Sequence, residues 1–168
     1  MVMQRSPEME ETAGNLLPTG ALTGVVGKHF LTWGLYGKKV WETNLQKGSI
    51  LQESIGRNAA FGLLEHPKDG IVTLLSPISH HVTKAEMVES TNAQGQKVYE
   101  VVGEIAVLET EEGKKLKALI EGGYNPLVSS RGYGSLEKAS DGVDEVKEDY
   151  VCEGWDVVIK PSFENAEL

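Results

Sequence analysis

The chain has 168 residues, enough for one domain with a substantial hydrophobic core. Its composition, 40% hydrophobic and 24% charged, is typical of a soluble globular protein. The net charge of -9 argues against direct nucleic-acid binding, because phosphate recognition needs a positive patch. No apolar run approaches the ~20 residues of a membrane span. The single cysteine, Cys152, excludes an internal disulfide and fits a reducing cytosol.

The N-terminal segment, residues 1–22, contains Pro, Gly, Glu and Thr without periodicity, which predicts a flexible arm. It is polar and acidic, unlike a signal peptide. The rest, residues 23–168, is predicted to form one domain. Within it, residues 24–41 mix glycines with aromatic and branched residues, which indicates one or two short strands with tight turns.

The middle of the chain has the patterns of strands and turns. Residues 58–70 end in a turn signal from Pro67 to Gly70, and residues 71–90 alternate well enough for one or two strands. The sequence of residues 92–96, "NAQGQ", is typical of a hairpin tip. Residues 97–110 then predict a long strand.

One helix is clear, over residues 110–123. Thr110 is a suitable N-cap, acidic residues occupy the first turn, and Gly122 and Gly123 end the helix. Residues 124–138 predict strand and turn, residues 139–149 an acidic loop, and residues 150–162 a final strand closed by Pro161. The chain is therefore predicted to be α+β, with a mostly antiparallel sheet or small β-barrel and a few helices.

His66 is a candidate general base. It lies at the end of a predicted strand in "LLEHPKDG", and Pro67 fixes the backbone just after it. A histidine at a strand end beside a rigid turn is held in one orientation and still reaches solvent, as a general base requires. The same pattern also fits a histidine in a surface loop.

The stretch "LVSSRGYGS" offers two neighbouring hydroxyls, Ser129 and Ser130. In an extended strand their side chains point to opposite faces, so one of them faces a given site. Arg131 and Gly132 follow, and charge or backbone N–H groups there suit the stabilisation of an oxyanion. A serine needs a base to become a nucleophile, and that base need not be near in sequence. Alone, the stretch also fits an ordinary Ser/Gly-rich loop.

Asp156 lies in the apolar strand "YVCEGWDVVIK", so we expect its carboxylate to be partly buried. A buried carboxylate costs several kcal/mol unless a partner pairs with it. A histidine partner would be oriented by the pairing, whereas a salt bridge to Arg131 or a lysine would be purely structural. Asp149 and Glu153 are alternative acids that spacing does not exclude.

The remaining histidines and the cysteine are expected to have structural roles. His80 and His81 are strand neighbours that face opposite ways, no third ligand stands at a usual spacing, and so no zinc site is predicted. His29 is most simply structural, and Cys152 in mid-strand is expected to be buried and inert. The sequence contains no P-loop or dinucleotide fingerprint, and no cofactor is predicted.

Five segments in order resemble the prohead (procapsid) core maturation proteases of tailed bacteriophages: "LLEHP", "ISHHV", "VVGEIAVLETEEGKKLKALIEGG", "VSSRGYGSL" and "DYVCEGWDVVIKPS". The resemblance covers roughly residues 62–162. This family is related in fold to the herpesvirus assembly proteases, the assemblins, so the resemblance implies an assemblin-like fold.

The resemblance implies a serine endopeptidase with a Ser-His-acid site. His66 matches the base of the family's acidic-or-Asn-His-Pro motif, and the nucleophile is a serine of "SSRG". Ser130 is the preferred candidate because it adjoins the Arg-Gly turn, with Ser129 as the rival. The third member falls on Asp156, 26 positions after Ser130. Arg131 and Gly132 would form the oxyanion environment. His80 matches a Ser-His motif whose role is structural or supports the catalytic residues.

The resemblance also implies where the protein acts. Such an enzyme is packaged inside the viral procapsid, which assembles in the host cytoplasm, and cleaves scaffold or core proteins, the major capsid protein and itself. We expect it to form a homo-oligomer on assembly, with no nucleic-acid or membrane partner. Family cleavage sites follow a glutamate two residues after an aliphatic side chain, a pattern that Leu51-Gln52-Glu53 fits. The alternative is a non-catalytic capsid-assembly or scaffold-like protein on the same fold. An esterase is disfavoured because no Gly-x-Ser-x-Gly elbow is present.

Overall fold

The computed structural model describes residues 21–27, 37–91, 95, 97–138 and 144–159. Eight strands and three helices lie within these residues: β1 (Ala21–Gly27), α2 (Lys38–Leu45), α3 (Ile50–Gly56), β2 (Phe61–Leu63), β3 (Ile78–Thr91), β4 (Lys97–Val107), α4 (Glu111–Glu121), β5 (Leu127–Tyr133), β6 (Leu136–Lys138), β7 (Asp144–Val146) and β8 (Val151–Val158). The α+β class predicted from the sequence is confirmed.

The largest sheet has the strand order β1-β4-β3-β2, and every pair in it is antiparallel. Its centre is the long β3–β4 hairpin, which pairs from His80↔Val107 to Thr91↔Lys97. The long strand predicted for residues 97–110 is thus confirmed for Lys97–Val107. The predicted hairpin tip, residues 92–96, lies outside the described residues except for Gly95.

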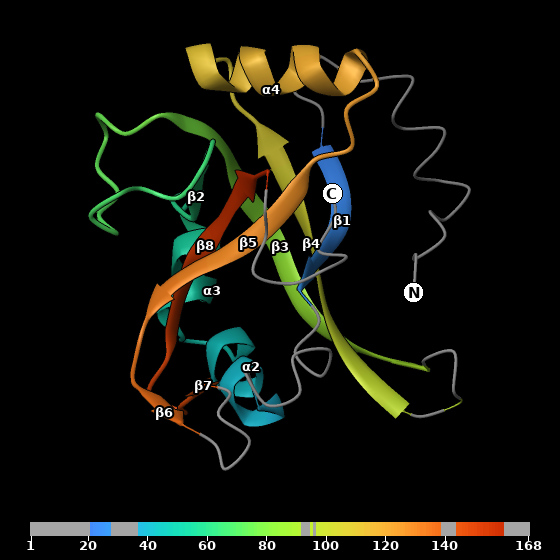
Figure 1. Ribbon diagram of the computed structural model, residues 1–168, viewed down its shortest axis with the longest axis vertical. Coiled ribbons are helices and arrows are strands. Elements are labelled where there is room, and N and C mark those ends of the chain that lie inside the picture. Colours follow the sequence, from blue (N-terminus) through green and yellow to red (C-terminus); the bar gives the residue numbers. More distant parts are fainter. Residues whose placement is uncertain (1–20, 28–36, 92–94, 96, 139–143, 160–168) are drawn as a thin grey trace.

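Strands β5 and β8 form a second antiparallel sheet, which crosses in front of β3 and β4 in Figure 1. A short β6–β7 hairpin extends from it. One parallel bridge, Leu64↔Val157, joins the end of β2 to β8. Among the described residues the strand pairs do not close into a barrel, so the antiparallel sheets are confirmed and the small barrel is not found.

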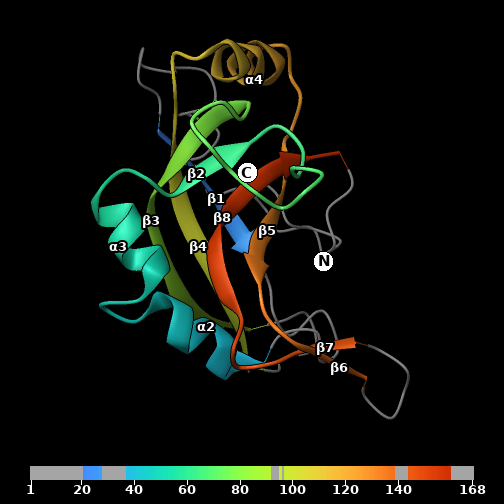
Figure 2. The same cartoon turned by 90° about the vertical axis from the view of Figure 1, so that its left-hand side faces the viewer.

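The core lies between the two sheets and helices α2 and α3. Trp155 from β8 stacks on Trp41 from α2, with ring centroids 5.8 Å apart and an interplanar angle of 14°. Tyr150 meets the Trp41 ring edge-on at 6.3 Å. Leu51 and Ile55 of α3 are buried in the same cluster. Figure 2 shows both helices beside the sheets, toward the end opposite α4. The aromatic stack therefore ties β8 to the helices.

Helix α4 confirms the prediction for residues 110–123. The Thr110 side chain accepts a hydrogen bond from the Gly113 N–H at 3.0 Å, and two glutamates lie in the first turn. Gly123, with φ of +93°, ends the helix in a conformation that favours glycine. Leu116 is buried, and the sheet side of the helix covers one end of the sheet.

The strands predicted over residues 24–41 are only partly right. Residues 21–27 form β1, but Lys38–Trp41 belong to α2, because Val40, Trp41 and Asn44 gain burial on one helical face. Strand β1 begins at Ala21, near the end of the arm predicted for residues 1–22. The described residues do not include residues 1–20, His29 or Pro161. The division into an N-terminal arm and one domain therefore stays a prediction.

We predict that Trp41→Ala lowers the free energy of unfolding by about 3–5 kcal/mol, since it removes a fully buried aromatic side chain and its stack on Trp155. Leu119→Ala, at a 46% exposed position on α4, is the control and should change it by less than about 1 kcal/mol. Urea unfolding of both variants measures the difference. Equal losses in the two variants would contradict the anchoring role of the stack.

Candidate active site

Asp156 is the centre of the site. It lies in β8 and has no exposed surface, and three donors surround its carboxylate. The Leu63 N–H donates to Oδ1 at 3.0 Å, His66 Nδ1 lies 2.8 Å from Oδ2, and Arg131 Nε donates to Oδ2 at 3.0 Å. Three donors, two of them on groups that can carry positive charge, offset the desolvation of a buried carboxylate. The structure therefore brings Asp156 together with both partners considered from the sequence, His66 and Arg131.

His66 is held by the turn that follows β2. Glu65 has φ of +66°, and its N–H donates to the Val157 carbonyl at 2.7 Å, while its carboxylate accepts from the Ile159 N–H at 3.1 Å. These two bonds attach Glu65, the residue before His66, to the end of β8. The His66 side chain remains 41% exposed, although Nδ1 is bonded to a fully buried carboxylate. One edge of the imidazole is thus fixed and the other reaches solvent.

The bond to Asp156 also determines the tautomer of His66. An ionised carboxylate only accepts hydrogen bonds, so Nδ1 carries the proton. In the neutral ring Nε2 is then the acceptor, the nitrogen that can take a proton from a hydroxyl. This is the orientation of a general base in a serine hydrolase.

The two serines of "SSRG" lie on opposite faces of the β5–β8 sheet. Ser129 pairs with Asp156 across the strands, and Ser130 pairs with Trp155. Directly opposed residues in an antiparallel pair share a face. Ser129 is therefore on the face of Asp156, whereas Ser130 is on the face of Trp155. Ser129 is 2% exposed and Ser130 is half-buried.

The side chain of Arg131 lies on the same face of the sheet as Ser129, and its guanidinium binds two carboxylates. In addition to Asp156, its guanidinium binds Glu153 Oε2 at 2.9 Å and the Phe61 carbonyl at 2.8 Å, and the side chain is 7% exposed. Gly132 is packed tightly, since a Cβ there would lie 2.1 Å from the Val151 carbonyl oxygen. The oxyanion role of Arg131 and Gly132 stays a prediction, but these contacts account for both residues structurally.

The remaining acids have other partners. Asp149 accepts hydrogen bonds from the Ser135 N–H and hydroxyl, and the Ser135 bonds lower the pKa of Asp149. Glu153 binds Arg131. Of the three acids considered from the sequence, Asp156 is the one that contacts His66.

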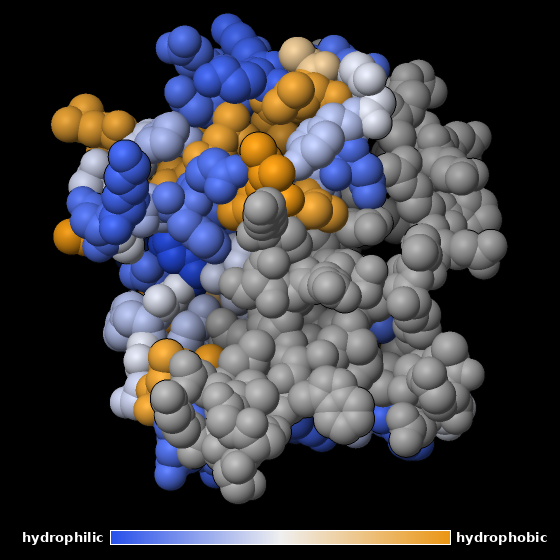
Figure 3. Space-filling view, in the orientation of Figure 1, coloured by the Kyte–Doolittle hydropathy of each residue, from blue (hydrophilic) through white to orange (hydrophobic). Residues whose placement is uncertain are grey.

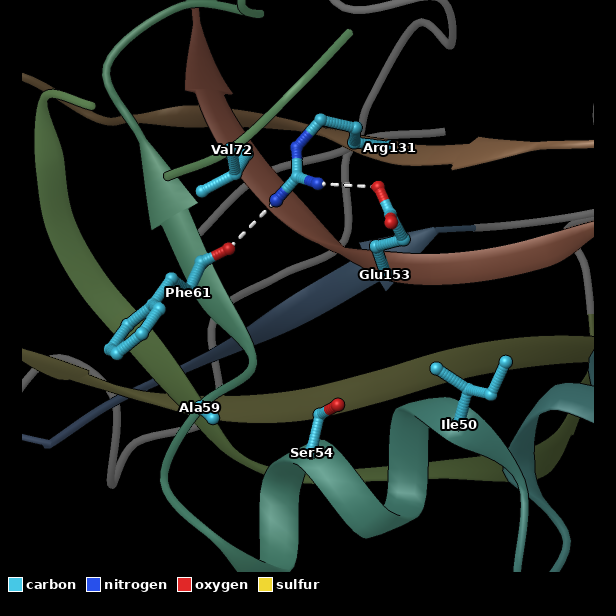
Figure 4. A pocket seen from close by; sticks show the side chains of 7 residues that line it. All are labelled: Ile50, Ser54, Ala59, Phe61, Val72, Arg131 and Glu153. Carbon is cyan, nitrogen blue, oxygen red and sulfur yellow. Dashed lines mark hydrogen bonds and ion pairs between the residues drawn. The ribbon is translucent and has the colours of Figure 1, made fainter. Parts of the chain in front are cut away.

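A cavity of about 180 Å³ lies beside Arg131, between α3, β2 and β8. Figure 4 shows the guanidinium reaching across it to the Phe61 carbonyl and to Glu153. The wall also contains Val72 of the β2–β3 connection. Arg131, one of the residues that anchor Asp156, therefore forms part of the wall of this cavity.

His80 lies behind the site and is fully buried. Burial lowers the pKa of His80 to about 4, so the ring is neutral near pH 7. Because a carbonyl only accepts, Nε2 donates to the Trp155 carbonyl at 3.0 Å, and Nδ1 accepts from the Ser79 hydroxyl at 2.9 Å. His80 thus fixes the backbone of the residue before Asp156.

Sequence reasoning missed the contribution of Gly62, which lets β2 pass close to His80. A Cβ on Gly62 would lie 2.0 Å from His80 Nε2 and 2.3 Å from the Trp155 carbonyl oxygen. A glycine inside a strand pattern is a known signal of such a close approach. It also missed the Leu63 N–H, for which the sequence gives no signal.

The Cys152 thiol is not placed for nucleophilic chemistry. Cys152 is buried, and burial raises the pKa of its thiol to about 12. No group of three potential metal ligands occurs in the part of the chain that the structure describes. None of the helices in that part has the length and apolar character needed to cross a bilayer.

The connection between His66 and β3 carries an apolar outer surface. Ile71, Leu74 and Leu75 are 62%, 85% and 96% exposed. Figure 3 shows apolar side chains at the edge of the molecule where this connection lies in Figure 1. The turn that holds the histidine thus leads directly into an exposed apolar loop.

A histidine oriented by a buried carboxylate is one part of the arrangement of a serine hydrolase, and β5, which carries the two serines, pairs with the strand of that carboxylate. Residues 26–168 match the model of the family described as prohead core protein serine protease. The chain belongs to this family, and it is a serine protease of prohead maturation. This confirms the resemblance seen in the five sequence segments.

A solved structure supports the same fold. The bacteriophage T4 capsid assembly protease, gp21, is similar with a TM-score of 0.68 and 24% sequence identity over 86% of this chain and 85% of that chain. No curated protein matches the sequence. The arrangement of sheets and helices is therefore that of a phage capsid assembly protease.

We predict that the stability conferred by His80 is lost in acid. In the unfolded chain a histidine titrates near pH 6.5, but His80 in the fold takes up its proton only near pH 4. As pH falls through this window the unfolded state binds more protons, so up to about 3 kcal/mol of stability is lost. His80→Gln keeps a donor for the Trp155 carbonyl but does not titrate. Urea unfolding should show the stability gap between wild type and variant narrowing from pH 7 to pH 4, and a constant gap would contradict the assignment.

A second prediction concerns Gly62. Gly62→Ala should lower the free energy of unfolding by more than about 2 kcal/mol, because the new methyl group overlaps His80 and the Trp155 carbonyl. Gly56→Ala, at the end of α3 with no atom within 4 Å of the added carbon, is the matched control and should be neutral or slightly stabilising. Similar stability of the two variants in urea unfolding would show that β2 can move away at little cost.

Proposed function

We propose that this chain is a serine endopeptidase that cleaves scaffold or core proteins, the major capsid protein and itself inside the procapsid. The observation that carries the proposal is the bond between His66 Nδ1 and the buried Asp156 carboxylate. It leaves Nε2 as the proton acceptor on the exposed edge of the ring. The family supplies the substrate class and the location, since prohead core proteases act during procapsid maturation.

The proposed mechanism follows from these groups. A serine of β5 attacks the substrate carbonyl while His66 Nε2 accepts the hydroxyl proton. The buried Asp156 stabilises the resulting imidazolium, which then donates the proton to the leaving amine. Water, activated in turn by His66, hydrolyses the acyl-enzyme.

The strand register supports Ser129 as the nucleophile. Ser129 shares the face of Asp156, and through Asp156 that of His66, whereas Ser130 shares the face of the core residue Trp155. The sequence favoured Ser130 because it adjoins Arg131 and Gly132, but these two residues continue strand β5 and form no turn. We propose Ser129, because the direction of the side chain decides which hydroxyl can reach the imidazole.

The candidate self-cleavage site Leu51-Gln52-Glu53 lies within α3. Leu51 is fully buried, and the Gln52 side chain donates to the Ala85 carbonyl at 3.0 Å. A protease binds its substrate in an extended form, so cleavage there requires local unfolding of α3. Self-cleavage of the folded protein is therefore expected at other sites.

We predict that Ser129→Ala reduces cleavage of the cognate scaffold protein by at least about 10³-fold, since the nucleophile is lost. Ser130→Ala should retain activity within about tenfold. Intact-mass measurements over time, on each variant mixed with the scaffold protein, test this. Circular dichroism and urea unfolding confirm that both variants fold.

The other possible results of these cleavage measurements lead to different conclusions. Loss of cleavage in Ser130→Ala alone would assign Ser130 and overturn the register argument, while the enzyme class stands. Normal cleavage by a folded double variant would contradict the proposed mechanism.

A further inference from the structure

We propose that Arg131 and Glu153 form a charge-balanced pair that positions the Asp156 carboxylate and keeps its negative charge available to a protonated His66. This rests on the proposed function, in which His66 is the general base. Arg131 is then a positioning residue that acts through Asp156. This differs from the oxyanion role that the sequence suggested for its side chain.

Arg131 makes three bonds that hold its guanidinium in place. Nε binds Asp156, Nη1 binds Glu153 and Nη2 binds the Phe61 carbonyl, at 3.0, 2.9 and 2.8 Å. A planar guanidinium with all three nitrogens engaged cannot rotate without losing bonds. It therefore fixes Asp156 Oδ2 relative to β2, the strand from which the His66 turn continues.

The same carboxylate oxygen of Asp156 contacts two groups that can carry positive charge. Both Arg131 Nε and His66 Nδ1 bind Oδ2 of Asp156. Arg131 alone would neutralise Asp156 and weaken its effect on the imidazolium. Glu153 offsets that positive charge, so the three groups together carry one negative charge. Protonation of His66 then makes the cluster neutral, which favours the imidazolium formed during the reaction.

Among the residues that the structure describes, the charged groups on the His66 turn and on β3 do not replace this pair. Glu65, Lys68 and Asp69 lie on its own turn and are exposed, so water screens them. His80 lies behind Asp156 on β3, and its burial keeps it neutral. The buried charge that acts on His66 therefore comes from Asp156 and Arg131, with the half-exposed Glu153 completing the balance.

Two substitutions separate charge from position. Glu153→Gln keeps an acceptor for Arg131 but removes the negative charge, so imidazolium is less favoured. The His66 titration and the acidic limb of the pH–rate profile should both move to lower pH by a few tenths of a unit, a small effect because Glu153 is 39% exposed. Arg131→Lys keeps the charge but cannot hold three acceptors. It should lower kcat about tenfold and leave the limb in place.

The control is Glu86→Gln, which removes an exposed, paired glutamate of β3 outside the cluster and should move neither quantity. The His66 titration is followed by NMR of the ring protons in resting protein, assigned with His66→Gln, so it needs no substrate. The pH–rate profile is measured with the cognate scaffold protein. Urea unfolding checks the fold of each variant.

The outcomes distinguish this proposal from the proposed function. If Glu153→Gln moves the NMR titration and the limb as expected, the charge balance is supported. If the protein cleaves scaffold but Glu153→Gln shifts the titration no more than Glu86→Gln, the proposal is overturned while the protease assignment stands. If the titration shifts but no preparation cleaves substrate, the proposed function fails and the electrostatic pair remains. A folded Arg131→Lys variant with wild-type kcat would overturn the positioning role.

Discussion

The site depends on a carboxylate that has no access to water. Asp156 remains charged in the fold only if its hydrogen bonds and charges replace hydration, and they come from β2, the His66 turn and β5. Three separate segments must therefore reach β8 at one point. The Leu64↔Val157 bridge and the Glu65 backbone bond hold the first two there. The folding requirement of one buried charge thus assembles the candidate catalytic groups.

Strands and helix α4 were predicted from local signals, whereas helix α3 was missed although Ser49 caps it and Glu53 lies in its first turn. Helix α4 is defined within fourteen residues by Thr110, the following glutamates and Gly123. The burial of Asp156 follows from the apolar pattern of one strand. Helix α2 was missed because it has no side-chain cap and no acidic first turn. Its helical state depends on burial of Trp41 against Trp155, a contact across more than a hundred residues that composition does not reveal.

The candidate site was only partly predictable for a related reason. The sequence identified the base, two hydroxyls and the acid as residue types, but their roles depend on which residues share a face. The side chains of Ser129 and Asp156 lie on the same face of the sheet because the β5–β8 register pairs the two residues. This register is a long-range property of the fold. The same register turns Arg131 toward Asp156 and Glu153. The adjacency of arginine to the serines, which suggested an oxyanion role, says nothing about that direction.

Strand β8 connects the core to the site through its alternation. Trp155 packs on Trp41 in the core, its carbonyl accepts from His80, and the next side chain, Asp156, lies among the charged groups. A slip of one residue would place the carboxylate against the tryptophan stack and the indole among the charges. The core therefore does more than stabilise the fold. Because burial of Trp155 opposes any such slip, the aromatic stack also keeps the acid facing His66.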